Sequence, residues 1–270
     1  MTTVTAQPGA TLPDLKTHVS LMETIRQSWL MAGRALQKMR RNPEQFFDVT
    51  IQPLLFTPMF GYIFGGAVAG GTSTYLPLLI PGLLAQTALT TCMGTGVTLR
   101  EDMEKGVFDR FRSLPMSRVA PLAGPAIADI VRYLVAAVMT ILVGVAMGYR
   151  PDPLGVVGGT LLIVLTAWSL AWVFTTLATV MKSAQGLQGV SLMIMFPLTF
   201  LSNAFVPAST LPSWLESFVN VNPVSHVVTA LRDLMNDGQV TGQVGWAVFA
   251  CLAVVAIFMP LAVKGYRRQV

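Results

Sequence analysis

Charged residues are scarce in this chain. Asp, Glu, Lys and Arg make up 11% of its 270 residues, whereas an average soluble domain carries about 25%. Hydrophobic residues account for 53%. So few charges cannot cover the surface of a globular domain of this size. The composition therefore predicts an integral membrane protein.

Cysteine is almost absent as well. The two cysteines, Cys92 and Cys251, both lie inside apolar runs. They offer neither metal-ligand spacing nor a disulfide framework, and we interpret them as small buried hydrophobic residues. Residues 1–20 also lack the apolar core of a cleavable signal peptide, so the first membrane span is expected to drive insertion.

Catalytic and nucleotide-binding motifs are missing too. The chain has no Gly-x-x-x-x-Gly-Lys-Ser/Thr run, no His-Glu-x-x-His and no Cys/His cluster. The glycine-rich run at 65–74 lacks the Lys-Ser/Thr ending of a phosphate loop, and we interpret it as a flexible outer turn. His226 stands alone, which favours a structural role over a metal ligand. The chain is therefore predicted not to be an enzyme, and no metal or cofactor is predicted on it.

Long apolar runs dominate what is present. A bilayer core needs about 20 apolar residues per helix, and six stretches approach that length. The sequence thus predicts an all-α integral membrane fold with six transmembrane helices. The six predicted spans are 46–64, 76–99, 122–147, 154–181, 189–206 and 243–263.

The N-terminal part is predicted to lie outside the membrane core. Residues 1–17 are polar, and we interpret them as a mobile tail. Residues 18–42 carry apolar residues at three-, four- and seven-residue steps with cations between them, the pattern of an amphipathic helix at the membrane surface. The apolar positions are Met22, Ile25, Trp29, Leu36 and Met39.

The segment 207–242 is too apolar for a free loop and too polar for a span. Short helices that dip into the outer interface, or a re-entrant hairpin, are expected there. The residues singled out in this outer re-entrant region are Pro207, Trp214, Asn222 and Pro223.

The distribution of basic residues predicts the orientation. If both termini are cytoplasmic, fifteen of the 18 Lys and Arg residues fall in inner segments. Arg150 and Arg232 fall in outer segments, and Arg132 lies within a span. This asymmetry follows the positive-inside rule. It also accounts for the basic balance of the chain without nucleic acid.

Asp129 and Arg132 are the oppositely charged pair inside a predicted span. Their i, i+3 spacing puts them on one helix face. An intramembrane ionisable residue is a functional candidate by default, and an ion- or proton-coupled carrier would use such an Asp. A structural ion pair near the inner face is the interpretation we prefer.

The stretch 100–121 connects the second and third predicted spans on the inner side. It is highly charged, and residues 101–113 are expected to form a short helix. Phe108 and Phe111 lie between charges, and a solvated loop gives no reason to expose them. A short helix with an aromatic knob is suited to a groove on a partner protein.

The run from Glu104 to Arg118 resembles the signature of type-2 ATP-binding-cassette exporter permeases, above all the daunorubicin/doxorubicin-resistance permease group. Phe205 to Leu215 resembles the outer segment of that family, and the run from Asn222 to Ser225 resembles its Asn-Pro element. The resemblance implies a coupling region that docks on an ATPase. The coupling residues carried over are Glu104, Gly106, Phe108, Arg110, Phe111, Arg112, Ser113, Leu114 and Pro115.

The resemblance further implies a half-transporter in the plasma membrane, with residues 18–42 as a connecting helix and 43–270 as the permease domain. Two permease subunits, alike or different, would pair with two separate ATPase subunits that hold ATP and Mg. Cargo in this family includes hydrophobic drugs and lipids, so multidrug or antibiotic resistance and lipid transport are the expected roles. A secondary carrier that uses Asp129, and a membrane assembly or immunity protein without transport, remain the alternatives.

Overall fold

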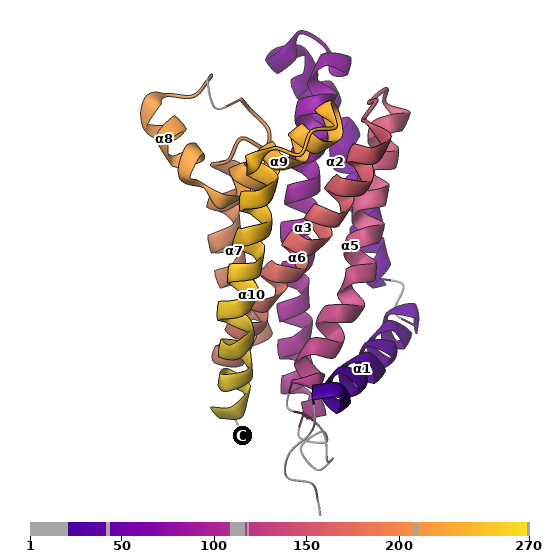
Figure 1. The fold of residues 1–270 in the computed structure, drawn as a ribbon, viewed down its shortest axis with the longest axis vertical. Coiled ribbons are helices and arrows are strands. Elements are labelled where there is room, and N and C mark those ends of the chain that lie inside the picture. The colour runs from indigo at the N-terminus through magenta and orange to yellow at the C-terminus, as the bar shows by residue number, and fades with distance from the viewer. Residues whose placement is uncertain (1–20, 42–43, 109–116, 118, 208–209, 269–270) are drawn as a thin grey trace, which may run out of the picture.

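The computed structural model describes residues 21–41, 44–108, 117, 119–207 and 210–268. Within these residues the regular elements are helices, and no strand occurs. The helices form an elongated bundle (Figure 1). At one end lie α8 (Ser213–Val221) and α9 (Pro223–Asp237). At the other lie α1 (Leu21–Arg41) and the C-terminal part of α10 (Gly242–Arg268), and we call this the charged end.

Five helices of the described chain are long and apolar enough to cross a membrane. They are α10 together with α2 (Glu44–Ala69), α3 (Thr72–Glu104), α5 (Ala120–Ala146) and α6 (Pro153–Val180). The remaining apolar helix, α7 (Ala184–Phe200), has 17 residues. At a rise of 1.5 Å per residue it reaches about 25 Å, slightly less than a bilayer core of about 30 Å. Five predicted spans thus have matching helices, and α7 as the sixth stays a prediction.

Helix α3 is the centre of the bundle. In its most apolar window 72% of the residues are buried inside the chain, compared with 22% in α2 and 17% in α10. It packs against α2, α5, α6, α7 and α9, and Leu76, Leu79 and Ile80 on it are completely buried. The peripheral helices expose large apolar side chains, such as Leu55 and Phe249. Such surfaces suit a hydrocarbon surrounding.

Prolines and glycines in α3 let α9 and its neighbours approach closely. Pro81 has no N–H, which leaves the carbonyl of Pro77 without its helical partner. Asn236 of α9 donates to that carbonyl at 3.0 Å. Next to it, a Cβ on Gly82 would lie 2.0 Å from the carbonyl oxygen of Ala204, so only glycine fits there. The broken helical hydrogen bond thus becomes an attachment point between distant segments.

Two predicted boundaries are wrong. The run 65–74 is not a loop: α2 continues to Ala69, α3 begins at Thr72, and a turn at Gly70 and Gly71 joins them. Gly70 has a φ of 69°, a conformation that glycine adopts without strain. The helix in the fifth predicted span begins earlier, at Ala184, and ends at Phe200 instead of continuing to residue 206.

The predicted amphipathic helix is present as α1, and its apolar stripe is exposed in the N-terminal half and buried in the C-terminal half. Met22, Ile25 and Trp29 are exposed. Met39 is buried together with Ala32 where α1 packs on α5. The C-terminal half therefore anchors the helix to the bundle, while the exposed N-terminal half keeps the pattern of a membrane-surface helix. Its contact with a membrane stays a prediction.

Candidate functional site

The predicted coupling residue Glu104 ends α3 and binds the start of α7. Its Oε1 accepts a hydrogen bond of 2.8 Å from the backbone N–H of Ala184, and Nε of Arg100 lies 3.6 Å from the same oxygen. Arg100 in turn donates to the carbonyl of Lys182 at 3.1 Å. A carboxylate at a helix N-terminus satisfies an N–H that has no helical acceptor. Glu104 therefore ties the end of α3 to the start of α7, and Arg100 ties it to the segment between α6 and α7.

The prediction of a separate short helix over 101–113 is wrong for residues 101–106. Residues 101–104 are the last turn of α3, and Lys105 and Gly106 form a turn after it. The N–H of Gly106 bonds to the carbonyl of Met103 at 3.1 Å. Gly106 has a φ of 69°, which side-chain-bearing residues adopt at a cost. Its position in the predicted signature thus has a physical reason: it turns the chain out of α3.

The prediction that Phe108 is exposed is wrong. Only 6% of it is accessible, and its ring meets that of Tyr266 edge-on with centroids 5.5 Å apart. Leu99, Leu122 and Trp172 belong to the same apolar cluster. Phe108 therefore attaches the start of the coupling segment to the C-terminal end of α10. The remaining predicted coupling residues, Arg110, Phe111, Arg112, Ser113, Leu114 and Pro115, lie outside the described residues.

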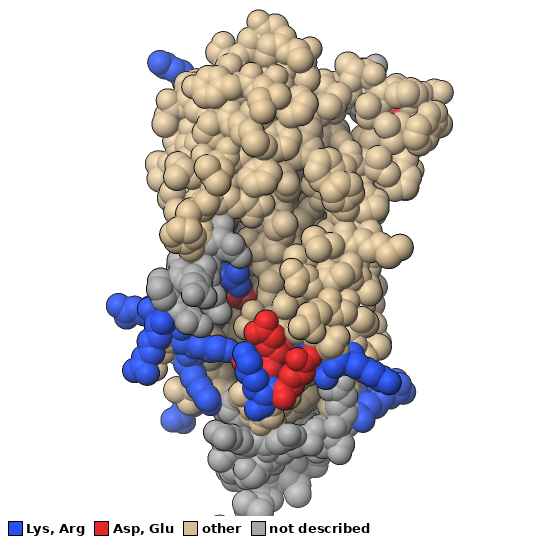
Figure 2. Space-filling view, turned by 180° about the vertical axis from the view of Figure 1, so that it is seen from behind, with Lys and Arg blue, Asp and Glu red and all other residues tan. Residues whose placement is uncertain are grey.

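Helix α1 is joined to this end by two polar contacts. Nζ of Lys38 lies 2.7 Å from a carboxylate oxygen of Asp102 on α3. The backbone N–H of Ser117 donates to Oε1 of Gln27 at 2.6 Å. The charged side chains on this side of the molecule gather in a belt at the charged end, with an almost uncharged surface beyond it (Figure 2). The sequence did not predict these pairings, because they join residues at least 64 positions apart.

The predicted pair of Asp129 and Arg132 exists and is buried. Nη1 of Arg132 donates to Oδ1 of Asp129 at 3.2 Å. The hydroxyl of Thr95 on α3 donates to Oδ2 of Asp129 at 2.5 Å, and it lies 2.9 Å from the hydroxyl of Tyr133. Both carboxylate oxygens thus have donors. Sequence reasoning missed Thr95 and Tyr133, since a hydroxyl in an apolar helix carries no distinct signal.

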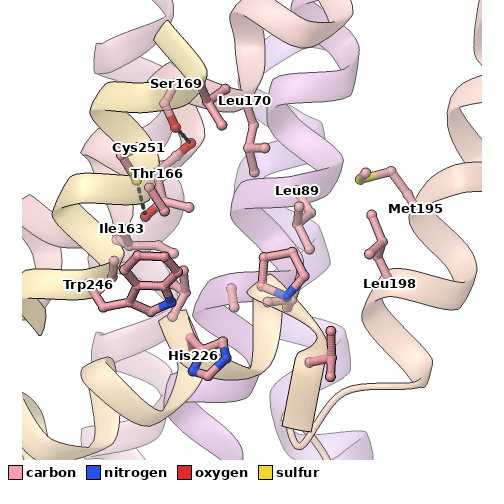
Figure 3. A pocket seen from close by; sticks show the side chains of 18 residues that line it. Leu89, Ile163, Thr166, Ser169, Leu170, Met195, Leu198, His226, Trp246 and Cys251 are labelled. Atoms are coloured by element: carbon pink, nitrogen blue, oxygen red, sulfur yellow. Dashed lines mark hydrogen bonds between the residues drawn. The ribbon is translucent and has the colours of Figure 1, made fainter. Parts of the chain in front are cut away.

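An apolar cavity of about 200 Å³ lies under α9, between α3, α6, α7 and α10 (Figure 3). His226 and Trp246 lie together at one end of it. Nδ1 of His226 is 3.1 Å from Oε1 of Gln243, and its structural role stays a prediction. Cys251 is buried and lines the wall. Cys92 is buried and free as well.

The predicted Asn-Pro element caps α9. The side-chain oxygen of Asn222 accepts from the N–H of Val224 at 2.9 Å, and its amide donates to the carbonyls of Leu198 and Leu201 at 2.8 and 2.7 Å. Pro223 occupies the first helical position, where its missing N–H costs nothing. These bonds join the end of α7 to the start of α9.

The other predicted residues of this end, Pro207 and Trp214, lie apart from that cap. Pro207 precedes α8, and its carbonyl accepts from the hydroxyl of Thr210 at 2.8 Å. Trp214 lies on α8 and is 72% exposed. Two short helices therefore occupy the predicted amphiphilic region, and their entry into a membrane stays a prediction.

Arg232 is a half-buried cation at this end, which the sequence analysis placed in an outer segment without a role. Its Nη2 donates to the carbonyls of Leu78 and Asn203 at 3.0 and 2.6 Å. Burial lowers the pKa of Arg232 to about 10, which leaves the side chain charged at neutral pH. These bonds to carbonyls of α3 and of the turn after α7 hold α9 on α3.

No group of three or more His, Cys, Asp or Glu residues in the described chain could hold a metal ion. Five long apolar helices, with charges gathered at one end, define a multi-pass membrane protein. Residues 26–236 match the family model described as ABC-2 type transporter. The chain therefore belongs to the ABC-2 type transporter family.

The named relatives show which members of this family the chain resembles. The chain is 39% identical over 248 residues to the daunorubicin resistance ABC transporter permease protein DrrB1 of Streptomyces coeruleorubidus, covering 91% of this chain and 86% of that protein. It is 26% identical over 249 residues to the probable doxorubicin resistance ABC transporter permease protein DrrC of Mycobacterium tuberculosis, covering 90% and 89%. The putative transport permease ycf38 of Cyanophora paradoxa is 25% identical over 215 residues, covering 78% and 74%. The predicted resemblance to the daunorubicin/doxorubicin-resistance permeases is confirmed.

Proposed function

We propose that this chain is the membrane-spanning permease subunit of an ATP-binding-cassette exporter that moves hydrophobic or amphipathic cargo outward. The family membership and the drug-resistance permeases among its relatives support this assignment. Separate ATPase subunits bind ATP and Mg. A second permease subunit completes the exporter. The protein lies in the plasma membrane with both termini in the cytoplasm. This orientation follows from the basic residues, which concentrate at the charged end.

The observation that carries the proposal is the interlocked charged end. Glu104 joins the end of α3 to the start of α7, and Asp102, two residues earlier, joins it to α1. Phe108 joins the chain that follows to α10. A force on the segment after Gly106 is therefore passed to four helices at once. This is what a coupling element between an external ATPase and the spans requires, since the contacts are packed and directional.

In this mechanism the ATPase subunits dock on the segment that starts at Glu104, and their closing and opening moves the attached helices. The cargo path then alternates between inner and outer access. Phe108 acts inside the permease, where it transmits the motion to α10. Contact with the ATPase is assigned to the residues from Arg110 to Pro115.

Stimulation of the ATPase tests this proposal. The permease is reconstituted in phosphatidylcholine nanodiscs with its cassette subunit, and ATP hydrolysis is measured with and without a hydrophobic drug. We expect hydrolysis to depend on the permease and to rise with the drug, because docking couples the two. The proposal would be refuted by a cassette subunit that does not bind the permease and hydrolyses ATP at the same rate with and without it.

The carrier alternative depends on Asp129. Both oxygens of this carboxylate accept hydrogen bonds, from Arg132 and from Thr95. A coupling carboxylate must exchange its proton or ion during the cycle, whereas this one is held in a closed set of partners. The geometry therefore favours the structural role.

A further inference from the structure

A second, polar cavity lies beside Arg132. It has a volume of about 470 Å³ and is formed by residues of α2, α3, α5 and α7. Val49, Met93 and Val97 give it an apolar part. The remaining wall is polar, and its polar residues are Gln52, Thr90, Thr91, Thr98, Glu101, Arg132 and Gln188. The apolar cavity under α9 has no comparable set of donors.

Arg132 brings unused hydrogen-bond donors to this cavity. A guanidinium has five N–H groups. Among the described residues Arg132 makes one hydrogen bond, to Asp129, and its Nε is buried without a partner. The residue is 93% buried, since its exposed fraction is 7%. Nε itself is inaccessible, whereas Nη2 has no hydrogen-bond partner among the described residues and is not fully buried. An acceptor that enters the cavity can therefore pair with Nη2.

Gly94 leaves the approach to the guanidinium open. It lines the cavity, and a Cβ built on it would lie 3.6 Å from Nη2 and 3.9 Å from Nη1 of Arg132. These are ordinary contact distances, so a larger side chain at this position would cover the guanidinium. Glycine keeps the cation within reach of a ligand.

Among the described residues, the charged side chains that line the cavity are paired with opposite charges. Arg132 is paired with Asp129, and Glu101 lies 3.5 Å from Nζ of Lys105. The other polar groups of the wall are amides and hydroxyls, which carry no charge. An added ion would upset this balance beside the buried pair of Asp129 and Arg132. An uncharged acceptor can take the free N–H groups without that cost.

We infer that this cavity binds amphipathic molecules that present an uncharged acceptor oxygen, such as a carbonyl, to Arg132. The apolar body of the ligand packs against Val49, Met93 and Val97. That the ligand is transported cargo rests on the proposed function, whereas the binding itself does not.

Three probes of one ring framework test the inference: fluorene without oxygen, 9-fluorenone with one carbonyl, and fluorene-9-carboxylate with a charge. Binding is measured by equilibrium dialysis of the full chain in phosphatidylcholine nanodiscs, with empty nanodiscs as the blank. We expect 9-fluorenone to bind more tightly than fluorene, and the carboxylate to bind no more tightly than 9-fluorenone. Equal binding of fluorene and 9-fluorenone, or tightest binding of the carboxylate, would overturn the inference.

Two variants test whether 9-fluorenone binds in this polar cavity. Gly94→Leu covers the guanidinium, and Asp129→Asn with Arg132→Met removes it without leaving a lone charge. Each should weaken 9-fluorenone binding by at least about tenfold and leave fluorene unchanged. Gly245→Leu is the matched control, since nothing lies within 4 Å of a Cβ there. Unchanged 9-fluorenone binding in both site variants contradicts the inference. Intact binding without coupling to an ATPase would instead contradict the proposed function.

Discussion

At the residue scale, Glu104 is the contact that most directly links α3 to α7. Glu104→Ala removes the acceptor of the Ala184 N–H, and we expect a loss of about 1 kcal/mol of stability, because the side chain is partly exposed. Transport should fall more than ATP hydrolysis, since the link between the two is weakened. Glu104→Gln keeps an acceptor oxygen and should recover most of the coupling.

The matched control for Glu104 is Glu216→Ala. Glu216 lies in the first turn of α8, at the opposite end of the bundle, and does not line the polar cavity. The ratio of transported cargo to hydrolysed ATP is the measurement. Equal ratios for Glu104→Ala and Glu216→Ala would show that the link to Ala184 plays no part in coupling.

The buried pair yields a second prediction at this scale. Asp129→Ala leaves Arg132 charged and without its partner, and the expected loss is about 3–5 kcal/mol. Changing Asp129 to Asn together with Arg132 to Met removes both charges and should restore most of that stability. Thermal unfolding in detergent compares the variants. If the double variant is as unstable as Asp129→Ala, the two side chains contribute more to stability than the cancelling of each other's charge.

The sequence singled out an individual residue only where that type of residue is rare inside a membrane span. Asp129 and Arg132 were found because charge inside a span is unusual. Thr95, which completes their network, could not be found, because Thr is common in these helices. Phe108 was misjudged, since its partner Tyr266 lies 158 residues away and local charge gives no sign of that packing.

At the scale of elements, close helix contacts depend on glycines that the sequence alone does not distinguish. A Cβ on Gly82 would lie 2.0 Å from the carbonyl of Ala204, whereas one on Gly66 would meet nothing within 4 Å. We therefore expect Gly82→Ala to destabilise the protein by more than about 1 kcal/mol, and Gly66→Ala to stabilise it by about 0.5–1 kcal/mol. Thermal unfolding of both variants checks the opposite signs, and two effects of the same sign would contradict the assigned packing.

Helices with strong apolar runs were predicted well, and their ends were not. The turn at Gly70 and Gly71 was expected to be a ten-residue loop, because glycine-rich sequence resembles a turn even where the helix continues. The last turn of α3 was assigned to a separate helix, because its charges hide its continuity with the apolar part. Close contacts such as the one at Gly82 depend on the whole bundle and have no local signature.

At the scale of the whole molecule, the asymmetric charge predicts one orientation. Cys92 and Cys251 are both buried, so a background with both changed to Ala allows single new cysteines. Lys264→Cys at the charged end should react with an impermeant maleimide only in inverted vesicles. Gln239→Cys, exposed after α9, should react only in intact cells. The reverse pattern would contradict both the orientation and the proposed direction of coupling.

The central claim is that the whole bundle is driven by ATP hydrolysed on another chain. Uptake of a fluorescent hydrophobic drug into inverted vesicles that contain this permease and its cassette subunit measures this directly. The account predicts uptake that requires ATP, stops when the Walker lysine of the cassette subunit is replaced, and persists when a protonophore collapses the proton gradient. Uptake that continues without the cassette subunit, or that vanishes with the protonophore while ATP remains, would contradict it.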